Sequence, residues 1–187
     1  MIGLETAIGS VLAAFGLSGA AGLNAWLPLL ASALLARLDV VELAAPFDEL
    51  SSTTGIVVLA VLTAGDFVGD KIPLVDHVLH LLGTVVAPAS GAILFTGQTG
   101  LETDLPTILA VVLGALTAGS IHAGRSAVRP VSTATTGGLG NPILSLGEDL
   151  GSLTLVIVSF VLPLVAVLLL IWLAVVFARR FARRPLP

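Results

Sequence analysis

The segment LTLVIVSFVLPLVAVLLLIWLAVVF, residues 153–177, contains no charged residue. A helix needs about 20 apolar residues to cross the roughly 30 Å hydrocarbon core of a bilayer, so this segment predicts a membrane span. Of the 187 residues, 56% are hydrophobic and 11% are charged, and the mean hydropathy is +1.09. A soluble domain carries about 25% charged residues. The composition therefore indicates an integral membrane protein and argues against a soluble enzyme, a disordered tail or a nucleic-acid binder.

The chain has no cysteine, which excludes disulfides, thiolate metal sites and a cysteine nucleophile. The N-terminus does not match a cleaved signal peptide, because Met1–Gly9 lacks Lys and Arg and contains Glu5. We expect this apolar segment to remain in the protein as a membrane span.

The remaining apolar runs extend this prediction to an all-α, polytopic protein with about six spans in one transmembrane domain, residues 1–187. The expected spans are Leu4–Arg37, Thr54–Asp70, Leu74–Phe95, Leu105–Arg125, Val131–Leu150 and Leu153–Phe177. Glycine and proline interrupt several of them, for example at Gly22 and Pro28 in the first. The fifth is rich in Gly and Thr and either crosses the membrane or forms a re-entrant segment.

The distribution of charge predicts the orientation. With the C-terminal arginines in the cytoplasm, six alternating spans place seven of the eight basic residues on that side, all except Arg37. The opposite side then receives the acidic residues Asp39, Glu42, Asp48, Glu49, Glu102, Asp104, Glu148 and Asp149. This is the positive-inside pattern, and it predicts a multi-pass protein of the inner membrane with both termini cytoplasmic.

The sequence also contains a possible internal repeat. Leu62–Gly65 recurs as Leu116–Gly119, an offset of 54, and the same offset relates Gly83 to Gly137 and Pro88 to Pro142. Residues 54–100 and 105–152 would then be two parallel units. Repeats with interrupted helices are typical of transporters, although helices rich in Ala, Gly and Leu also match one another by chance.

Ionisable residues concentrate in the segment 65–80. They are Asp66, Asp70, Lys71, Asp76, His77 and His80. Because charge is costly to bury in a membrane, such residues are candidates for function. Three interpretations remain open: Lys71 neutralises Asp70 or Asp76 in a purely structural role, the carboxylates and histidines handle a proton or cation, or Asp66, Asp70, Asp76 and His80 hold a divalent metal.

A second group follows in the segment 122–149. It comprises His122, Arg125, Arg129, Asn141, Glu148 and Asp149. The arginines either anchor the chain at the interface or provide counter-charge for Asp66 and Asp70. Asn141 follows a Gly-rich break at 137–140, and Asn24 lies in a comparable break. We therefore expect Asn24 and Asn141 to face each other and, with Glu148 and Asp149, to line a path. The alternatives are helix–helix contacts for the asparagines and a solvated outer end for the two acids.

Four segments carry a resemblance to a known family. They are Ser18–Pro28, Asp70-Lys-Ile-Pro-Leu-Val-Asp76, His122–Arg129 and Thr135–Asp149, the last with the pattern Asn-Pro-x-x-Ser-x-x-Glu-Asp. Over roughly residues 10 to 175 the chain resembles a bacterial family of small integral-membrane proteins known only as a domain of unknown function. The resemblance implies a multi-span helical protein and supplies no substrate. Arg125 stands where that family often has Lys. Gly65–Asp76 also faintly resembles membrane CTP-dependent lipid cytidylyltransferases.

These features lead us to expect a small transporter or channel for an ion or small charged solute, without a cofactor and functioning as a homo-oligomer in the lipid bilayer. Two alternatives stay open. One is a membrane enzyme acting on a lipid or polyprenyl phosphate, with Mg²⁺ on Asp66, Asp70 and Asp76. The other is a structural or accessory membrane protein, in which every buried charge is paired locally.

Overall fold

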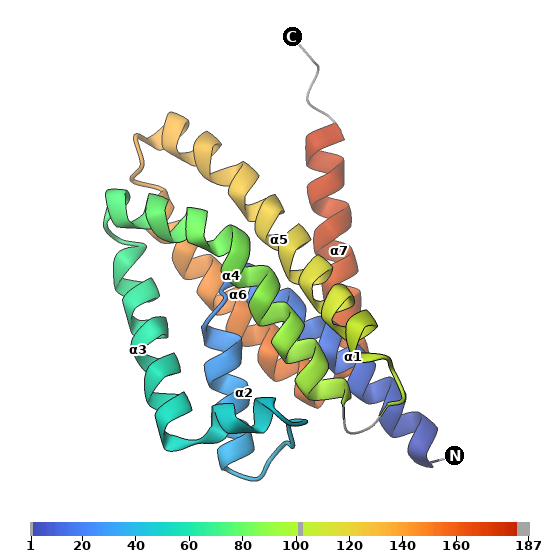
Figure 1. The fold of residues 1–187 in the computed structure, drawn as a ribbon. Coiled ribbons are helices and arrows are strands. Elements are labelled where there is room, and N and C mark those ends of the chain that lie inside the picture. Colours follow the sequence, from blue (N-terminus) through green and yellow to red (C-terminus); the bar gives the residue numbers. More distant parts are fainter. Residues whose placement is uncertain (1, 101–102, 183–187) are drawn as a thin grey trace.

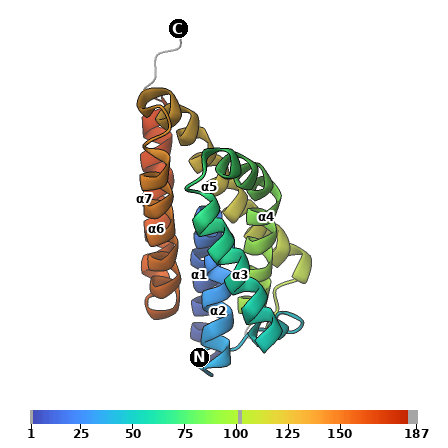
Figure 2. The same cartoon turned by 90° about the vertical axis from the view of Figure 1, so that its left-hand side faces the viewer.

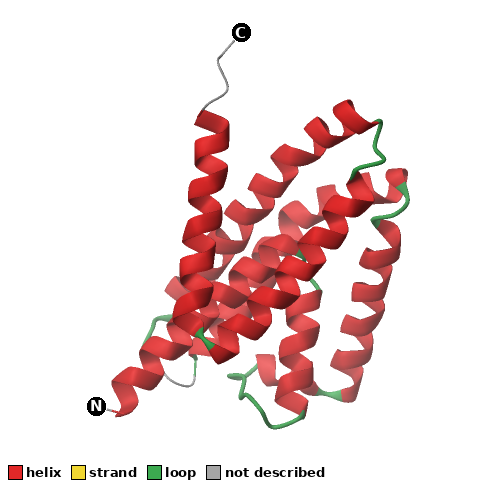
Figure 3. Cartoon of the chain, turned by 180° about the vertical axis from the view of Figure 1, so that it is seen from behind, coloured by secondary structure: helices red, strands yellow, loops and turns green. Residues whose placement is uncertain are grey.

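The computed structural model describes residues 2–100 and 103–182, and this part of the chain is helical throughout, without a strand (Figures 1 and 3). The elements are α1 (Ile2–Leu23), α2 (Leu27–Arg37), the 3-10 helix η1 (Phe47–Ser51), α3 (Thr53–Gly69), α4 (Pro73–Thr99), α5 (Thr107–Thr136), α6 (Asn141–Val161) and α7 (Pro163–Ala182). The all-α prediction is therefore confirmed.

Four of these helices contain segments long and apolar enough to cross a membrane. They are Glu5–Leu23, Val78–Thr99, Thr107–Thr136 and Asn141–Val161. The helices Leu27–Arg37 and Thr53–Gly69 and the segment Pro163–Val176 are apolar but shorter. Large apolar side chains such as Val85, Leu116 and Trp172 are exposed on the outer surface, as expected for a surface that lipid covers. The protein is thus a multi-pass membrane protein.

Helix α1 is the centre of the bundle, since it packs against α4, α5, α6 and α7. Its inward residues are mostly small, and Ala14, Ala20 and Ala21 are completely buried. The Ser18 hydroxyl donates to the Gly91 carbonyl of α4 at 2.9 Å. Membrane helices commonly associate through small residues that let their backbones approach closely. This packing holds α4 and α5 against one side of α1 and α6 and α7 against another (Figure 2).

The chain reverses direction within the predicted first span. Helix α1 ends at Leu23, and after the break at Asn24–Trp26 helix α2 returns toward the end of the bundle from which α1 began (Figure 1). The expectation of one span over Leu4–Arg37 is therefore wrong. As a result, the N-terminal and C-terminal ends of the described chain lie at opposite ends of the bundle, which differs from the expectation that both termini share one side.

We call the end of the bundle with the α3–α4 and α5–α6 turns the upper end, as drawn in Figure 1, and the opposite end the lower end.

The boundaries of the last two predicted spans are also wrong. Gly137 and Gly138, with φ of 63° and 88°, form the α5–α6 turn in a left-handed conformation that glycine adopts readily. Pro163 then separates α6 from α7, because proline cannot continue a helix but can begin one. The segments 131–150 and 153–177 each contain one of these breaks.

The residues related by the offset of 54 correspond in the first helix of each pair and not beyond it. Helices α3 and α5 begin at Thr53 and Thr107, so Leu62–Gly65 and Leu116–Gly119 hold the same helical positions. Gly83 lies inside α4, whereas Gly137 lies in the α5–α6 turn, and Pro88 lies inside α4, whereas Pro142 begins α6. The repeat of residues 54–100 in 105–152 stays a prediction.

Candidate functional site

Arg129 is the centre of a buried charged cluster toward the upper end of the bundle. Its side chain is 5% exposed. It donates to Asp76 of α4, and its Nη2 lies 2.8 Å from Glu148 Oε2 of α6. The same nitrogen is 3.8 Å from Asp70 Oδ2, directly after α3. The Arg129 guanidinium therefore joins three carboxylates from three different segments. Pairing of this kind offsets the cost of burying the charged groups.

Helix α6 contributes three polar side chains to this cluster from one face. Ser145, Glu148 and Asp149 are spaced at three and four residues, so they lie on neighbouring turns. The Ser145 hydroxyl donates to Asp70. Sequence analysis did not single out Ser145, although it stands inside the Asn-Pro-x-x-Ser-x-x-Glu-Asp pattern. Glu148 and Asp149, expected on the side opposite the arginines, instead lie beside Arg125 and Arg129, because the segment 131–150 turns back at Gly137.

Arg125 connects the cluster to the end of α1. Its guanidinium donates to the carbonyl of Leu23, one of the last carbonyls of that helix, and its Nε lies 3.4 Å from Glu148 Oε2. Cations are favoured at a helix C-terminus, where carbonyl groups lack a partner within the helix. Arg125 thus satisfies a carbonyl at the C-terminal end of α1 and also provides a counter-charge for Glu148 of α6.

Asn24 forms the break between α1 and α2 and holds two carboxylates. Its Oδ1 accepts from the backbone N–H of Trp26 and of Leu27, each at 3.0 Å, which orients the start of α2. Its Nδ2 donates to Asp66 Oδ2 at 3.0 Å and to Asp149 Oδ1 at 2.8 Å. Within the described residues, the second oxygen of Asp149 is buried without a hydrogen-bond partner.

Two of the three histidines lie against each other between α4 and α5. The rings of His80 and His122 have centroids 5.0 Å apart at an angle of 32°. Gly83 leaves room for the His122 ring, since a Cβ there would collide with it. His122 is 4% exposed. His77 is on α4, but its side chain is outside the described part of the structure.

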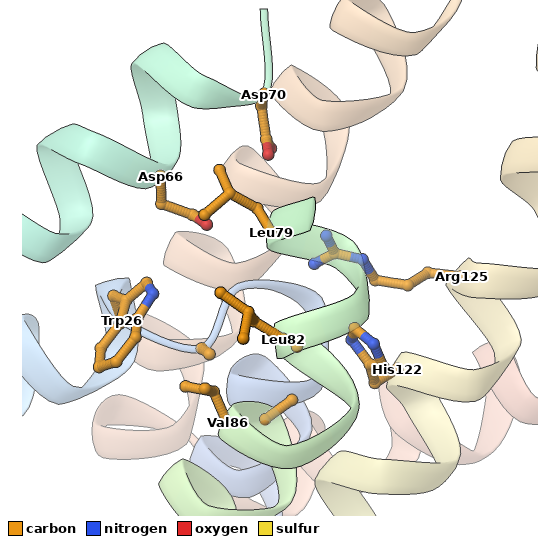
Figure 4. A pocket seen from close by; sticks show the side chains of 11 residues that line it. Trp26, Asp66, Asp70, Leu79, Leu82, Val86, His122 and Arg125 are labelled. Atoms are coloured by element: carbon orange, nitrogen blue, oxygen red, sulfur yellow. The ribbon is translucent and has the colours of Figure 1, made fainter. Parts of the chain in front are cut away.

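A pocket opens beside this cluster, between the 24–26 break and helices α3, α4 and α5 (Figure 4). Its atom-free space, with the open mouth included, is about 490 Å³. The lining residues are Ala25, Trp26, Asp66, Asp70, Leu79, Leu82, Gly83, Val86, Ala87, His122 and Arg125. The pocket therefore combines carboxylates from α3, apolar side chains from α4, and the ends of His122 and Arg125.

Two predicted site residues lie elsewhere. Lys71 is exposed, with Nζ 2.6 Å from the Phe67 carbonyl and 3.2 Å from the centroid of the Phe67 ring. Asn141 donates to Thr133 Oγ1 at 3.1 Å across the exposed α5–α6 turn, so it does not face Asn24. One of the three open interpretations paired Lys71 with Asp70 or Asp76, and the residue that pairs with both is Arg129.

Among the side chains that the structure describes, which do not include that of His77, no group of three or more His, Asp or Glu is arranged to hold a metal ion. The candidate ligands are instead distributed among other partners: Asp76 contacts Arg129, Asp70 contacts Ser145, and Asp66 contacts Asn24. The cluster and the pocket contain more acidic than basic side chains. The guanidinium groups of Arg125 and Arg129 lie among five carboxyl groups, those of Asp66, Asp70, Asp76, Glu148 and Asp149.

Comparison with known proteins identifies the family but not a characterised relative. No curated protein and no solved structure matches the chain. Residues 11–183 match the family described as a domain of unknown function, DUF4126, so the match contains the whole charged cluster and the pocket. The chain therefore belongs to the DUF4126 family.

Proposed function

We propose that this protein is a small membrane transporter or channel for a cation or small charged solute, which enters the pocket beside Asp66 and Asp70. The observation that carries the proposal is the charge balance of the cluster. Five carboxylates share two guanidinium groups inside a helical bundle, and two of the five line a pocket. A structural network would be favoured if every charge were neutralised locally, whereas an excess of acid in a pocket favours a cation.

The helix break at Asn24 supports the same function. Transporters commonly place their sites where helices are interrupted, because unwound backbone is tolerated beside a cavity. Here the break contributes Trp26 to the pocket, and Asn24 connects it to Asp66 and Asp149. A solute that binds Asp66 would therefore affect the junction of α1 and α2 through the side chain of Asn24.

The charge distribution supports an inner-membrane orientation with the upper end in the cytoplasm. Lys71 and Arg179, near the end of α7, belong to the upper end, whereas Asp39, Glu42 and Asp104 belong to the lower end. The positive-inside rule then places the C-terminus in the cytoplasm. The reversal at Asn24 places the N-terminus on the other side. A homo-oligomer remains part of the proposal, because the apolar outer surface of one small bundle offers room for a second copy.

The proposal is tested by charge movement in proteoliposomes on a solid-supported membrane. Wild type, Asp66→Asn and Asp104→Asn are challenged with steps of cations, anions and pH. We expect a current that one class of cation evokes, that Asp66→Asn abolishes and that Asp104→Asn retains, because Asp104 is exposed at the lower end. Currents that are equal in wild type and Asp66→Asn would contradict the proposal.

One observation favours the second candidate, an enzyme acting on a lipid phosphate. An apolar groove of about 260 Å³ lies between α1, α5, α6 and α7 and is lined by Leu155, Leu170, Leu173 and Arg125 among others. Such a groove fits an acyl or prenyl chain with its phosphate near Arg125. Turnover of a lipid phosphate that requires Mg²⁺ and is lost in Arg125→Ala would favour this candidate over transport.

A further inference from the structure

We propose that the pocket between the 24–26 break, α3 and α4 binds a small organic cation that carries N–H groups, such as a guanidinium or primary ammonium ion. The inference rests on the proposed function, since it names the class of solute for that site. Four features of the pocket carry it: paired carboxylates, a buried histidine acceptor, an aromatic wall and an apolar wall.

The carboxylates form the first feature. Asp66 and Asp70 are four residues apart on one side of α3, with the Asp70 amide donating to the Asp66 carbonyl in helical geometry. Figure 4 shows both side chains directed toward the pocket. Asp66 accepts from the neutral amide of Asn24, and no described Lys, Arg or His lies within 4.0 Å of its carboxylate oxygens. A ligand cation would supply the missing positive charge.

His122 is an independent indication that something polar binds here. Its side chain lines the pocket although the residue is 4% exposed, and among the described residues its Nε2 has no hydrogen-bond partner. Buried polar atoms are nearly always paired, so an unpaired one requires an explanation. An unprotonated imidazole nitrogen accepts a hydrogen bond. A guanidinium or ammonium ion has enough N–H donors to serve both Asp66 and His122.

The tryptophan and the apolar side chains of the pocket favour an organic cation over a hydrated inorganic one. Trp26 lines the side of the pocket at the helix break, and Leu79, Leu82 and Val86 line it from α4. An indole attracts a cation through its ring face, and the effect is greater where water is excluded. Inorganic cations prefer a cage of oxygen ligands, which three apolar side chains do not supply. The cavity volume of about 70 Å³ restricts the ligand to a small body.

Binding is measured through Trp26 itself, because the sequence has two tryptophans. In the full-length Trp172→Phe protein, Trp26 is the remaining fluorophore, and guanidinium or methylammonium chloride is titrated against equal concentrations of NaCl. We expect a saturable change with either organic cation that NaCl does not reproduce. Asp66→Asn should weaken the apparent affinity at least about tenfold, since a charge-assisted hydrogen bond is lost. Asp104→Asn should bind as the parent does.

A second variant covers the possibility that Asp66→Asn does not fold. Val86→Phe adds volume to the apolar wall without changing a charge, and it should also abolish the saturable response. Absence of saturation in the parent protein, or identical titrations for the parent and Val86→Phe, would overturn the inference.

The two proposals fail in different ways. A response that saturates with guanidinium, together with no current from any solute, supports the site and contradicts transport. Currents that depend on Asp66 with inorganic cations, together with no response to guanidinium or methylammonium, support transport and overturn the organic-cation class.

Discussion

The crossing of α1 with α4 and α5 and the charged cluster at the upper end are held together by different forces. At the crossing, the small residues Ser18, Gly91 and Gly114 let the backbones of α1, α4 and α5 approach one another, and the Ser18 hydroxyl donates to the Gly91 carbonyl. In the cluster, charged side chains from four segments are joined through Arg129 and Arg125, with acid in excess. The first region is held together by close packing, whereas the second contains the site that we propose binds a cation. We therefore expect changes at the first region to act on stability and changes at the second to act on binding as well.

Removing the central charge of the cluster should have the largest effect. Arg129→Ala leaves Asp70, Asp76 and Glu148 buried without their guanidinium, and breaking a buried ion pair costs about 3–5 kcal/mol. We expect a free energy of unfolding lower by at least this amount, measured by denaturant titration in detergent. Arg37→Ala is the control, because the α2 arginine is outside the cluster. A loss below about 1 kcal/mol would show that the cluster does not depend on Arg129.

The crossing should be nearly as sensitive, but to volume rather than charge. A Cβ at Gly114 would lie 2.7 Å from Phe95 Cβ and would also collide with the Gly91 carbonyl. Gly114→Leu should therefore destabilise the protein by about 1–3 kcal/mol, the usual cost of overpacking. Gly65→Leu is the matched control, since a Cβ at Gly65 meets nothing within 4 Å. Equal thermal unfolding midpoints of the two variants would contradict the close packing described for this crossing.

The helix break connects the two regions, and its loss should have an intermediate effect. Asn24→Ala removes the acceptor that orients α2 and the donor shared by Asp66 and Asp149, which we expect to cost about 1–2 kcal/mol. Asn141→Ala, on the exposed α5–α6 turn, should change stability by less than about 0.5 kcal/mol. If both asparagines cost the same, the break would not be the connection that the hydrogen bonds indicate.

Lys71 should have the smallest effect, and it distinguishes the sequence interpretation from the structure. Lys71→Ala removes an exposed contact with Phe67, so stability should change by less than about 0.5 kcal/mol. The response to guanidinium should remain unchanged. A loss of stability comparable to that of Arg129→Ala would instead place Lys71 in the cluster.

The sequence was informative about which residues matter and much less about how they pair. The cost of burying charge made Asp66, Asp70, Arg129 and Asp149 candidates, and the structure places all four in the pocket or the cluster. The pairing of Arg129 with Asp76 and Glu148 could not be predicted, because it depends on how α4, α5 and α6 approach in space. Nothing local to Lys71 indicated that its place beside Asp70 and Asp76 would be taken by an arginine 53 residues after Asp76.

For the fold, likewise, the sequence was more informative about the elements than about their arrangement. Composition and apolar runs were sufficient for a multi-pass helical protein, and Gly22 and Pro28 correctly marked an interruption in the first span. The reversal at that interruption depends on Asp66 and Asp149, which hold Asn24 from distant parts of the chain. The Gly-rich segment 137–140 correctly indicated a helix break, but the reversal of the chain there was not predicted, because a break alone does not determine whether the next helix continues or returns.

The most direct test of the central claim, that the pocket is open to water and attracts cations, uses the absence of native cysteine. Val86→Cys places one thiol in the pocket wall, and its rates of modification by a cationic and an anionic methanethiosulfonate reagent are compared. The account predicts that the cationic reagent reacts faster by about tenfold, as expected for a site that concentrates cations, and that adding Asp66→Asn reduces this ratio. A thiol that neither reagent modifies, or one that the anionic reagent modifies faster, would contradict the account.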